Sequence, residues 1–202
     1  SHQPKCVICA SRFLKTLKAT EISAGLSEII KYGLIYDREF FQWILKNTQQ
    51  ILSNDPVAVA HAIQRSCAIK AEIVAQDEKE QSVRALLNFG HTFGHAIEKL
   101  TGYGNWTHGD AVAVGMVLAA RLSENMSLIT PEDVQNIEGA LTAANLPISL
   151  PSIDPTELLA AMKSDKKAKD RKIQLVLLKK IGEAFLTADY AKEDLTNLLR
   201  AS

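Results

Sequence analysis

The chain has 202 residues, of which 47% are hydrophobic, and its 23 Lys and Arg residues balance its 23 Asp and Glu residues. This composition allows a sizeable hydrophobic core and argues against disorder, and the zero formal charge argues against a general nucleic-acid binder, which needs a basic excess. The longest apolar run, over residues 111–120, is too short to span a bilayer, and no apolar signal-peptide core follows the N-terminus.

The first strand is expected over residues 5–10, an apolar stretch that contains Cys6 and Cys9. These two residues match the C-x-x-C pattern, but the sequence has no second pair to complete a four-thiolate zinc site. We therefore interpret them as core residues. With Cys67 they do not form a disulfide framework, which favours a reducing, cytoplasmic location.

Three helices are expected next, over residues 20–34, 37–47 and 55–76. Gly33 is expected to end the first helix. Asp37 is the expected N-cap of the second helix, and Asp55 that of the third, with Pro56 in the first helical position.

Helical patterns continue over residues 83–100, 107–125, 131–144, 155–162 and 193–199. The second of these begins with a capping pair, Thr107 and Asp110, and is apolar nearly all round, which is typical of a helix at the centre of a bundle. A basic loop over residues 164–172 precedes a predicted β-hairpin, with strands over residues 173–178 and 184–187. The predicted fold is mainly α: a helical bundle domain with a small β-hairpin.

Residues 83–100 carry an unusual polar face. At 100° per residue, Arg84, Asn88, His91 and His95 fall within about 60° of one another, opposite the apolar side chains. A solvated face would normally carry Lys and Glu. Arginine, asparagine and imidazole side chains instead hold anions, hydroxyls and metals.

A catalytic zinc site needs about three nitrogen or oxygen ligands and one open position. His91 is the first candidate, because glycines beside it let another helix come close. His108 is the second, at the start of the buried helix. Glu28 is the third, because it lies on a mostly apolar helix where a charge needs a partner or a metal. Glu28 can instead pair with Lys31, and each residue taken alone is more often structural.

A second set of side chains is typical of an anion pocket. Arginine binds carboxylates bidentately, and lysine is a good point charge for phosphate. The members of this set are Lys70, Arg84, Asn88, Lys166 and Lys167.

These residues belong to motifs that occur in order along the chain, over residues 24–33, 67–72, 84–98, 108–116 and 165–167. Together the motifs strongly resemble the 3-dehydroquinate synthases of the shikimate pathway, which make precursors of chorismate and the aromatic amino acids. The resemblance covers only the C-terminal helical domain of that family, over residues 1–202. It implies that an N-terminal NAD-binding α/β domain is missing, and that most of the NAD-binding residues lie there.

The resemblance also implies roles for individual residues. Glu28, His91 and His108 would be the ligands of a catalytic Zn²⁺ or Co²⁺. Lys70, Arg84 and Asn88 would hold the substrate carboxylate and nearby hydroxyls. Lys31 and Glu80 would line the substrate pocket, His95 would transfer protons, and Lys166, or Lys167 in its place, would contact the phosphate. Asp110 departs from the family, which usually has Glu there.

The implied reaction converts the sugar phosphate 3-deoxy-D-arabino-heptulosonate 7-phosphate to 3-dehydroquinate and phosphate, a lyase reaction that regenerates NAD. The resemblance also implies a homodimer. Related sugar-phosphate cyclases are one alternative, and a non-catalytic helical domain is another. Metal-dependent alcohol dehydrogenases are a further alternative, against which Glu28, Lys70, Arg84 and Asn88 argue. We expect the isolated domain to be inactive.

Overall fold

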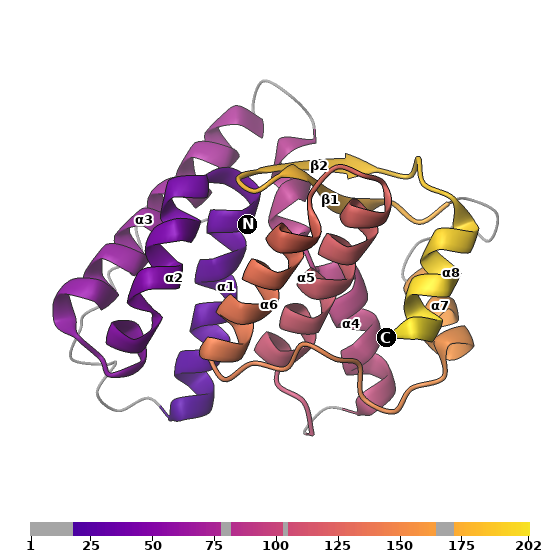
Figure 1. The fold of residues 1–202 in the computed structure, drawn as a ribbon, viewed down its shortest axis with the longest axis horizontal. Helices are drawn as coiled ribbons and strands as arrows, with labels where there is room; N and C mark the ends of the chain where they lie inside the picture. The colour runs from indigo at the N-terminus through magenta and orange to yellow at the C-terminus, as the bar shows by residue number, and fades with distance from the viewer. Residues whose placement is uncertain (1–17, 78–81, 103–104, 165–171) are drawn as a thin grey trace, which may run out of the picture.

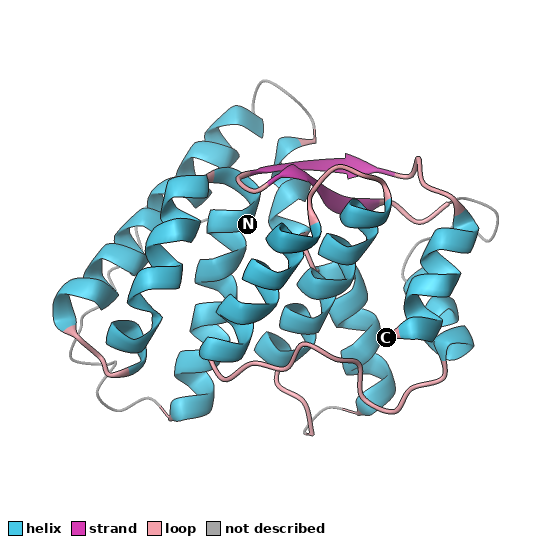
Figure 2. Ribbon diagram, viewed as in Figure 1, coloured by secondary structure: helices cyan, strands magenta, loops and turns pink. Residues whose placement is uncertain are grey.

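The computed structural model describes residues 18–77, 82–102, 105–164 and 172–202. These residues form helices and one small hairpin (Figures 1 and 2), which confirms the predicted fold class. The α-helices are α1 (Ala19–Tyr36), α2 (Arg38–Leu52), α3 (Pro56–Asp77), α4 (His91–Thr101), α5 (His108–Asn125), α6 (Pro131–Ala143), α7 (Pro155–Ser164) and α8 (Lys192–Ala201). A 3₁₀ helix, η2 (Val83–Asn88), precedes α4, and the strands are β1 (Leu175–Lys180) and β2 (Glu183–Thr187).

Helix α5 lies at the centre of the bundle, as its apolar sequence predicts. It packs against α1, α4, α6, α8 and β1, and Figure 1 shows it surrounded by these elements. Residues from Ala111 to Ala120 along this helix are all buried. A side chain at the first turn of α5 is therefore placed by contacts on several sides.

The β-hairpin is confirmed, with antiparallel strands that pair Leu175 with Thr187. The amide of Leu178 donates a hydrogen bond to the Ser123 hydroxyl at 3.0 Å, which fastens β1 to α5. The amide of Gly182 in the hairpin turn donates to the carbonyl oxygen of Leu34 at 2.8 Å. The hairpin thus links α5 to the end of α1.

The predicted N-caps of α2 and α3 are confirmed, because Asp37 and Asp55 accept hydrogen bonds from backbone amides three residues later. The prediction that Gly33 ends the first helix is wrong, since α1 continues to Tyr36. A Cβ atom at Gly33 would lie 2.9 Å from the Cα of Phe41. This glycine therefore allows α1 and α2 to approach closely.

The predicted single helix over residues 83–100 is also wrong, because the chain breaks it at Gly90. This residue has a φ of 77°, and the regular turns of α4 begin only at His91. A Cβ atom at Gly90 would lie 2.6 Å from the side chain of Met116 and 2.9 Å from the carbonyl oxygen of Val112. Position 90 thus requires glycine both for its left-handed backbone and for its close contact with α5, and the polar face of α4 does not extend to Arg84 and Asn88.

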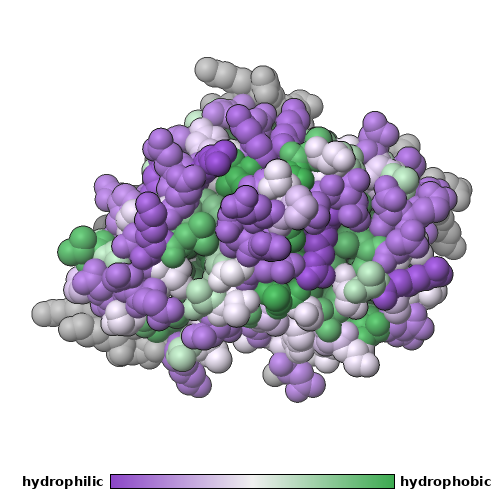
Figure 3. Space-filling model, in the orientation of Figure 1, coloured by the Kyte–Doolittle hydropathy of each residue, from purple (hydrophilic) through white to green (hydrophobic). Residues whose placement is uncertain are grey.

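Hydrophilic residues cover most of the face shown in Figure 3, and hydrophobic residues appear between them. None of the helices in the described residues combines the length and apolarity that a bilayer crossing requires. The predicted strand over residues 5–10, with Cys6 and Cys9, lies outside the described residues.

Candidate metal centre

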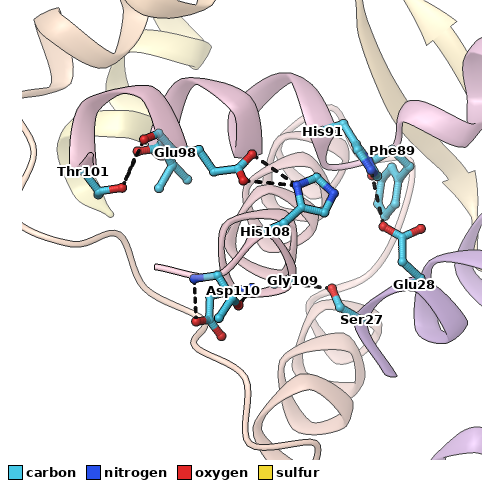
Figure 4. Close-up of polar contacts among 11 residues, drawn as sticks. Ser27, Glu28, Phe89, His91, Glu98, Thr101, His108, Gly109 and Asp110 are labelled. Carbon is cyan, nitrogen blue, oxygen red and sulfur yellow. Dashed lines mark hydrogen bonds and ion pairs between the residues drawn. The ribbon is translucent and has the colours of Figure 1, made fainter. Parts of the chain in front are cut away.

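Three side chains from three helices converge at one end of the central helix. Glu28 lies in the middle of α1, and His91 and His108 are the first residues of α4 and α5. One possible ligand atom from each of them lies within 4.8 Å of the others. Figure 4 shows the carboxylate of Glu28 directed toward the imidazole of His91, with His108 beside them. The structure therefore brings together the three residues that the sequence selects as metal ligands.

His91 is oriented by the backbone. Its Nδ1 atom lies 3.0 Å from the carbonyl oxygen of Phe89, and its Nε2 atom lies 3.4 Å from Oε1 of Glu28. A carbonyl oxygen can only accept, so Nδ1 carries the proton and Nε2 keeps its lone pair in the neutral ring. Nε2 and Oε1 are then two lone-pair atoms that face each other, and a shared cation would stabilise that arrangement.

His108 has a similar arrangement with a different partner. Its Nδ1 atom lies 3.2 Å from one carboxylate oxygen of Glu98 and 3.3 Å from the other. In Figure 4 the second ring nitrogen lies on the side of Glu28 and His91. The His108 side chain is 50% exposed, so it can adjust its position toward a bound ligand.

Glu28 is held in its ionised form. Burial raises the pKa of its carboxyl group, but a hydrogen bond from Nε2 of His91, which the ring donates in its protonated form, and the charge of Lys31 outweigh this effect and hold the pKa at about 2, below the ordinary 4.5. The ammonium of Lys31 lies 2.5 Å from Oε2 of Glu28, and its side chain is only 5% exposed. The same ammonium lies 4.9 Å from the ring centre of Tyr32. Lys31 therefore neutralises one carboxylate oxygen, and the other oxygen faces His91.

The start of α5 is fixed against α1 by two contacts. The hydroxyl of Ser27 donates a hydrogen bond to the carbonyl oxygen of Gly109 at 3.1 Å. A Cβ atom at Gly109 would lie 2.5 Å from the Cα of Ala24, so the two helices approach more closely there than a side chain would allow. The predicted capping pair is present as well, because Thr107 and Asp110 form a capping box. His108 is thereby held next to Glu28.

His95 joins the two histidines in one cluster of rings. Its ring centre lies 5.7 Å from that of His91 and 6.1 Å from that of His108. The side chain is exposed, so it is accessible to a substrate that lies over the cluster. Its predicted role in proton transfer stays a prediction.

The predicted anion-binding residues Lys70, Arg84 and Asn88 are exposed on neighbouring elements. Lys70 lies on α3, and η2, which carries the other two, packs against α3. The backbone amide of Arg84 donates a hydrogen bond to Asp77 at the end of α3. The other residues predicted to contact substrate, Glu80, Lys166 and Lys167, lie outside the described residues.

Sequence reasoning missed Glu98 and Ser27, the side chains that contact the segment around His108. A signal for Glu98 was present in the sequence. Glu98 lies three residues after His95 and seven after His91, a spacing that places all three on one helical face. The hydrogen bond from Ser27 to Gly109 joins residues 82 positions apart, and no local pattern predicts such a contact.

Comparisons with known proteins identify relatives of this chain. The family model described as 3-dehydroquinate synthase C-terminal matches residues 25–168. The 3-dehydroquinate synthase of Hydrogenovibrio crunogenus is 50% identical over 199 residues, which are 98% of this chain and 56% of that protein. That of Psychrobacter arcticus is 50% identical over 197 residues, which are 98% of this chain and 51% of that protein. The chain thus spans about half the length of the curated relatives it matches.

Two solved structures share the fold. One is the 2-epi-5-epi-valiolone synthase of Streptomyces hygroscopicus subsp. jinggangensis with NAD⁺ and Zn²⁺ bound, with a TM-score of 0.84 and 25% identity over 95% of this chain and 53% of that one. The other is a 2-deoxy-scyllo-inosose synthase complexed with carbaglucose-6-phosphate, NAD⁺ and Co²⁺, with a TM-score of 0.79 and 25% identity over 95% of this chain and 55% of that one.

Proposed function

Because the chain belongs to the 3-dehydroquinate synthase C-terminal family, we propose that it supplies the metal- and substrate-binding part of a 3-dehydroquinate synthase. The proposed reaction converts 3-deoxy-D-arabino-heptulosonate 7-phosphate to 3-dehydroquinate and phosphate, within chorismate biosynthesis. NAD and Zn²⁺ or Co²⁺ are the proposed cofactors, as in the two related structures. A reducing compartment such as the cytoplasm fits Cys67, an exposed free thiol.

The observation that carries this proposal is the convergence of Glu28, His91 and His108. Two imidazoles and one carboxylate are a ligand set of catalytic zinc sites that keep one position open. Ligand atoms about 2.1 Å from a tetrahedral ion lie about 3.4 Å from each other, and Nε2 of His91 lies 3.4 Å from Oε1 of Glu28. Since the three ligand atoms lie within 4.8 Å of one another, His108 has to move closer by no more than about 1.4 Å.

The residues of this chain have separate proposed tasks. A metal ion at the centre would lower the pKa of a substrate hydroxyl and stabilise negative charge on oxygen. The exposed Arg84 and Lys70 would bind the substrate carboxylate, and Asn88 would hydrogen-bond to a hydroxyl. His95, within the ring cluster, would exchange a proton with the substrate. Lys31 would keep Glu28 ionised.

Two observations favour this substrate over those of the related cyclases. The chain is 50% identical to the 3-dehydroquinate synthase of Hydrogenovibrio crunogenus but 25% identical to the 2-epi-5-epi-valiolone synthase. In addition, Lys70 on α3 and Arg84 on η2 lie on elements that pack against each other, and two cationic side chains would suit a substrate that carries a carboxylate. NAD-binding residues would come mainly from a second, α/β part of the enzyme.

The metal site can be tested by elemental analysis. We expect the chain, dialysed against Zn²⁺ and then against buffer, to retain about one ion per chain. The variants His91→Ala and Glu28→Ala should lose it. His61→Ala is the matched control, because His61 lies against Trp43 with a ring separation of 4.4 Å, away from the cluster. Unchanged zinc content in the first two variants would refute the ligand assignment.

The activity can be tested on a protein that joins this chain to the remaining half of its relatives' length. We expect release of phosphate from 3-deoxy-D-arabino-heptulosonate 7-phosphate and formation of 3-dehydroquinate. Turnover of glucose 6-phosphate or sedoheptulose 7-phosphate instead would indicate one of the other cyclases. The 202 residues alone should show no turnover, since they offer NAD too little surface, and measurable synthesis by them would contradict that expectation.

A further inference from the structure

We propose that Glu98 is a positioning residue that fixes the tautomer and orientation of His108, and thereby prepares this imidazole to bind the metal. The inference rests on the proposed metal site. Glu98 is neither one of the proposed ligands nor one of the proposed substrate contacts, and its role depends on a hydrogen bond within this chain.

The geometry of the pair supports this role. The carboxylate of Glu98 lies across Nδ1 of His108, with both oxygens within 3.3 Å of it. The Glu98 side chain is 16% exposed, whereas that of His108 is 50% exposed. Glu98 also lies within the regular turns of α4. The carboxylate is therefore the fixed member of the pair, and the imidazole is the one that it orients (Figure 4).

The chemistry determines which nitrogen is free. An ionised carboxylate can only accept hydrogen bonds, so Nδ1 of His108 carries the proton and Nε2 keeps the lone pair. Figure 4 shows that this second nitrogen lies on the side of His91 and Glu28. A free histidine side chain has no such constraint, because either nitrogen can carry the proton.

His91 is prepared in the same way by a different acceptor. The carbonyl oxygen of Phe89 contacts Nδ1 of His91 at 3.0 Å, so both histidines of the centre have Nδ1 engaged and Nε2 available. Metal-bound histidines commonly donate their second N–H to a carboxylate or a backbone carbonyl, and loss of such a partner costs about 10–100-fold in metal affinity. Glu98 has the further advantage of a negative charge, which makes the imidazole a stronger ligand.

One other arrangement uses the same residue. His95, Glu98 and His108 also offer ligand atoms within 4.8 Å of one another. If Glu98 were itself a metal ligand, a metal ion would lie where the proton on Nδ1 of His108 contacts the carboxylate, and the hydrogen bond would be lost. Both carboxylate oxygens of Glu98 lie close to Nδ1 of His108, which favours the hydrogen bond. The number of zinc ions bound per chain separates the two arrangements.

The first measurement is zinc affinity, by competition with a chromophoric chelator. We expect Glu98→Ala to weaken zinc binding by about 10–100-fold. Glu98→Gln should lose less, because the amide oxygen still accepts from Nδ1. Glu138→Ala is the matched control, since Glu138 is 24% exposed and binds Arg121 on α5, and it should leave the affinity unchanged. Circular dichroism would verify that all variants are folded.

The second measurement is the ring tautomer in the zinc-free chain, from long-range ¹H–¹⁵N spectra at about pH 8, where histidine is neutral. We expect His108 to carry its proton on Nδ1 in the wild type and in Glu98→Gln, and mainly on Nε2 in Glu98→Ala. This readout does not depend on bound metal. If the wild type bound no zinc, the proposed metal site would be refuted, but the tautomer of His108 would still test the role of Glu98.

Three results would overturn the proposal. The first is an unchanged zinc affinity in Glu98→Ala. The second is a proton on Nε2 of His108 in the wild type. The third is a second zinc ion in the wild type that is lost in both Glu98→Ala and His95→Ala, which would make Glu98 a ligand of a separate site.

Discussion

Replacing Gly115 with alanine tests how strongly the metal centre depends on the packing of α4 against α5. A Cβ atom at Gly115 would lie 2.0 Å from the carbonyl oxygen of Gly90. That oxygen accepts the hydrogen bond from Gly94 that begins α4, at 2.9 Å, so it cannot turn away without breaking the helix start. The two helices must therefore separate, and they carry His91 and His108.

The expected magnitude follows from this distance. Carbon and oxygen atoms approach to about 3.3 Å, so the backbones must separate by about 1.3 Å. Overpacking typically costs about 1–3 kcal/mol, and a contact with backbone belongs at the upper end of that range. Alanine regains about 1 kcal/mol of helix propensity over glycine, which leaves a net loss of about 2 kcal/mol. For a domain of this size the loss should lower Tm by about 4–8 °C.

Zinc affinity should fall at the same time. Metal sites tolerate displacements of about 0.2 Å, so zinc binding must bring the helices back together against the strain. About 2 kcal/mol corresponds to about 30-fold in Kd. Urea denaturation and chelator competition on the Gly115→Ala chain measure the two effects.

Gly139→Ala is the matched control for this experiment. Gly139 lies within α6, and no atom lies within 4 Å of the Cβ position. The alanine there should stabilise the chain by about 0.5–1 kcal/mol and leave zinc affinity unchanged. If Gly115→Ala were as stable as Gly139→Ala and bound zinc equally well, close packing of α4 on α5 would not be what aligns the centre.

Two further predictions concern acid stability and helix capping. Since the pKa of Glu28 is about 2 in the folded chain against an ordinary 4.5, its ionised form stabilises the fold above pH 4.5, and this contribution is lost as the pH falls toward 2. With the side chain 35% exposed, we reduce the nominal value to about 1 kcal/mol. Urea denaturation of the zinc-free chain at about pH 5 and pH 3 should show about half of this loss, and the same loss in Glu28→Gln would contradict the assignment. Thr107→Ala and Thr130→Ala each remove the N-cap of a capping box and should each cost about 1 kcal/mol in denaturation experiments. Only Thr107→Ala should also weaken zinc binding, because α5 begins at His108; equal zinc affinity in the two variants would show that this cap does not position the histidine.

The sequence predicts the helices well where their signals are local. Asp37 and Asp55 cap helices as expected, and the apolar sequence of α5 places it at the centre. Gly33 and Gly90 show where local signals fail. The close approach of another helix at Gly90 is predicted correctly, but the break in the helix at that residue is not, and at Gly33 a contact with another helix replaces the predicted helix end. Phe41 requires a residue without a side chain at position 33, and Met116 requires one at position 90, where the left-handed backbone also favours glycine.

The same distinction holds for the site. Glu28, His91 and His108 could be selected because each is a ligand-type residue in an apolar or glycine-rich setting, and the structure places them together. The partners that orient them could not be selected in the same way. In the sequence Glu98 resembles any other glutamate of a helix, and only the fold places His108 beside it. The carbonyl oxygen of Phe89 has no sequence signature.

The burial of the site residues indicates what this chain can do by itself. Lys31 is buried and Glu28 is partly buried, so the ion pair beneath the cluster is in place in the bundle alone. His95, Arg84 and Asn88, the proposed substrate contacts, are exposed. Catalysis by charged groups is strongest where water is excluded, and nothing among the described residues covers these side chains. We therefore expect metal binding to be a property of this bundle, whereas turnover requires a second layer of protein over its exposed side.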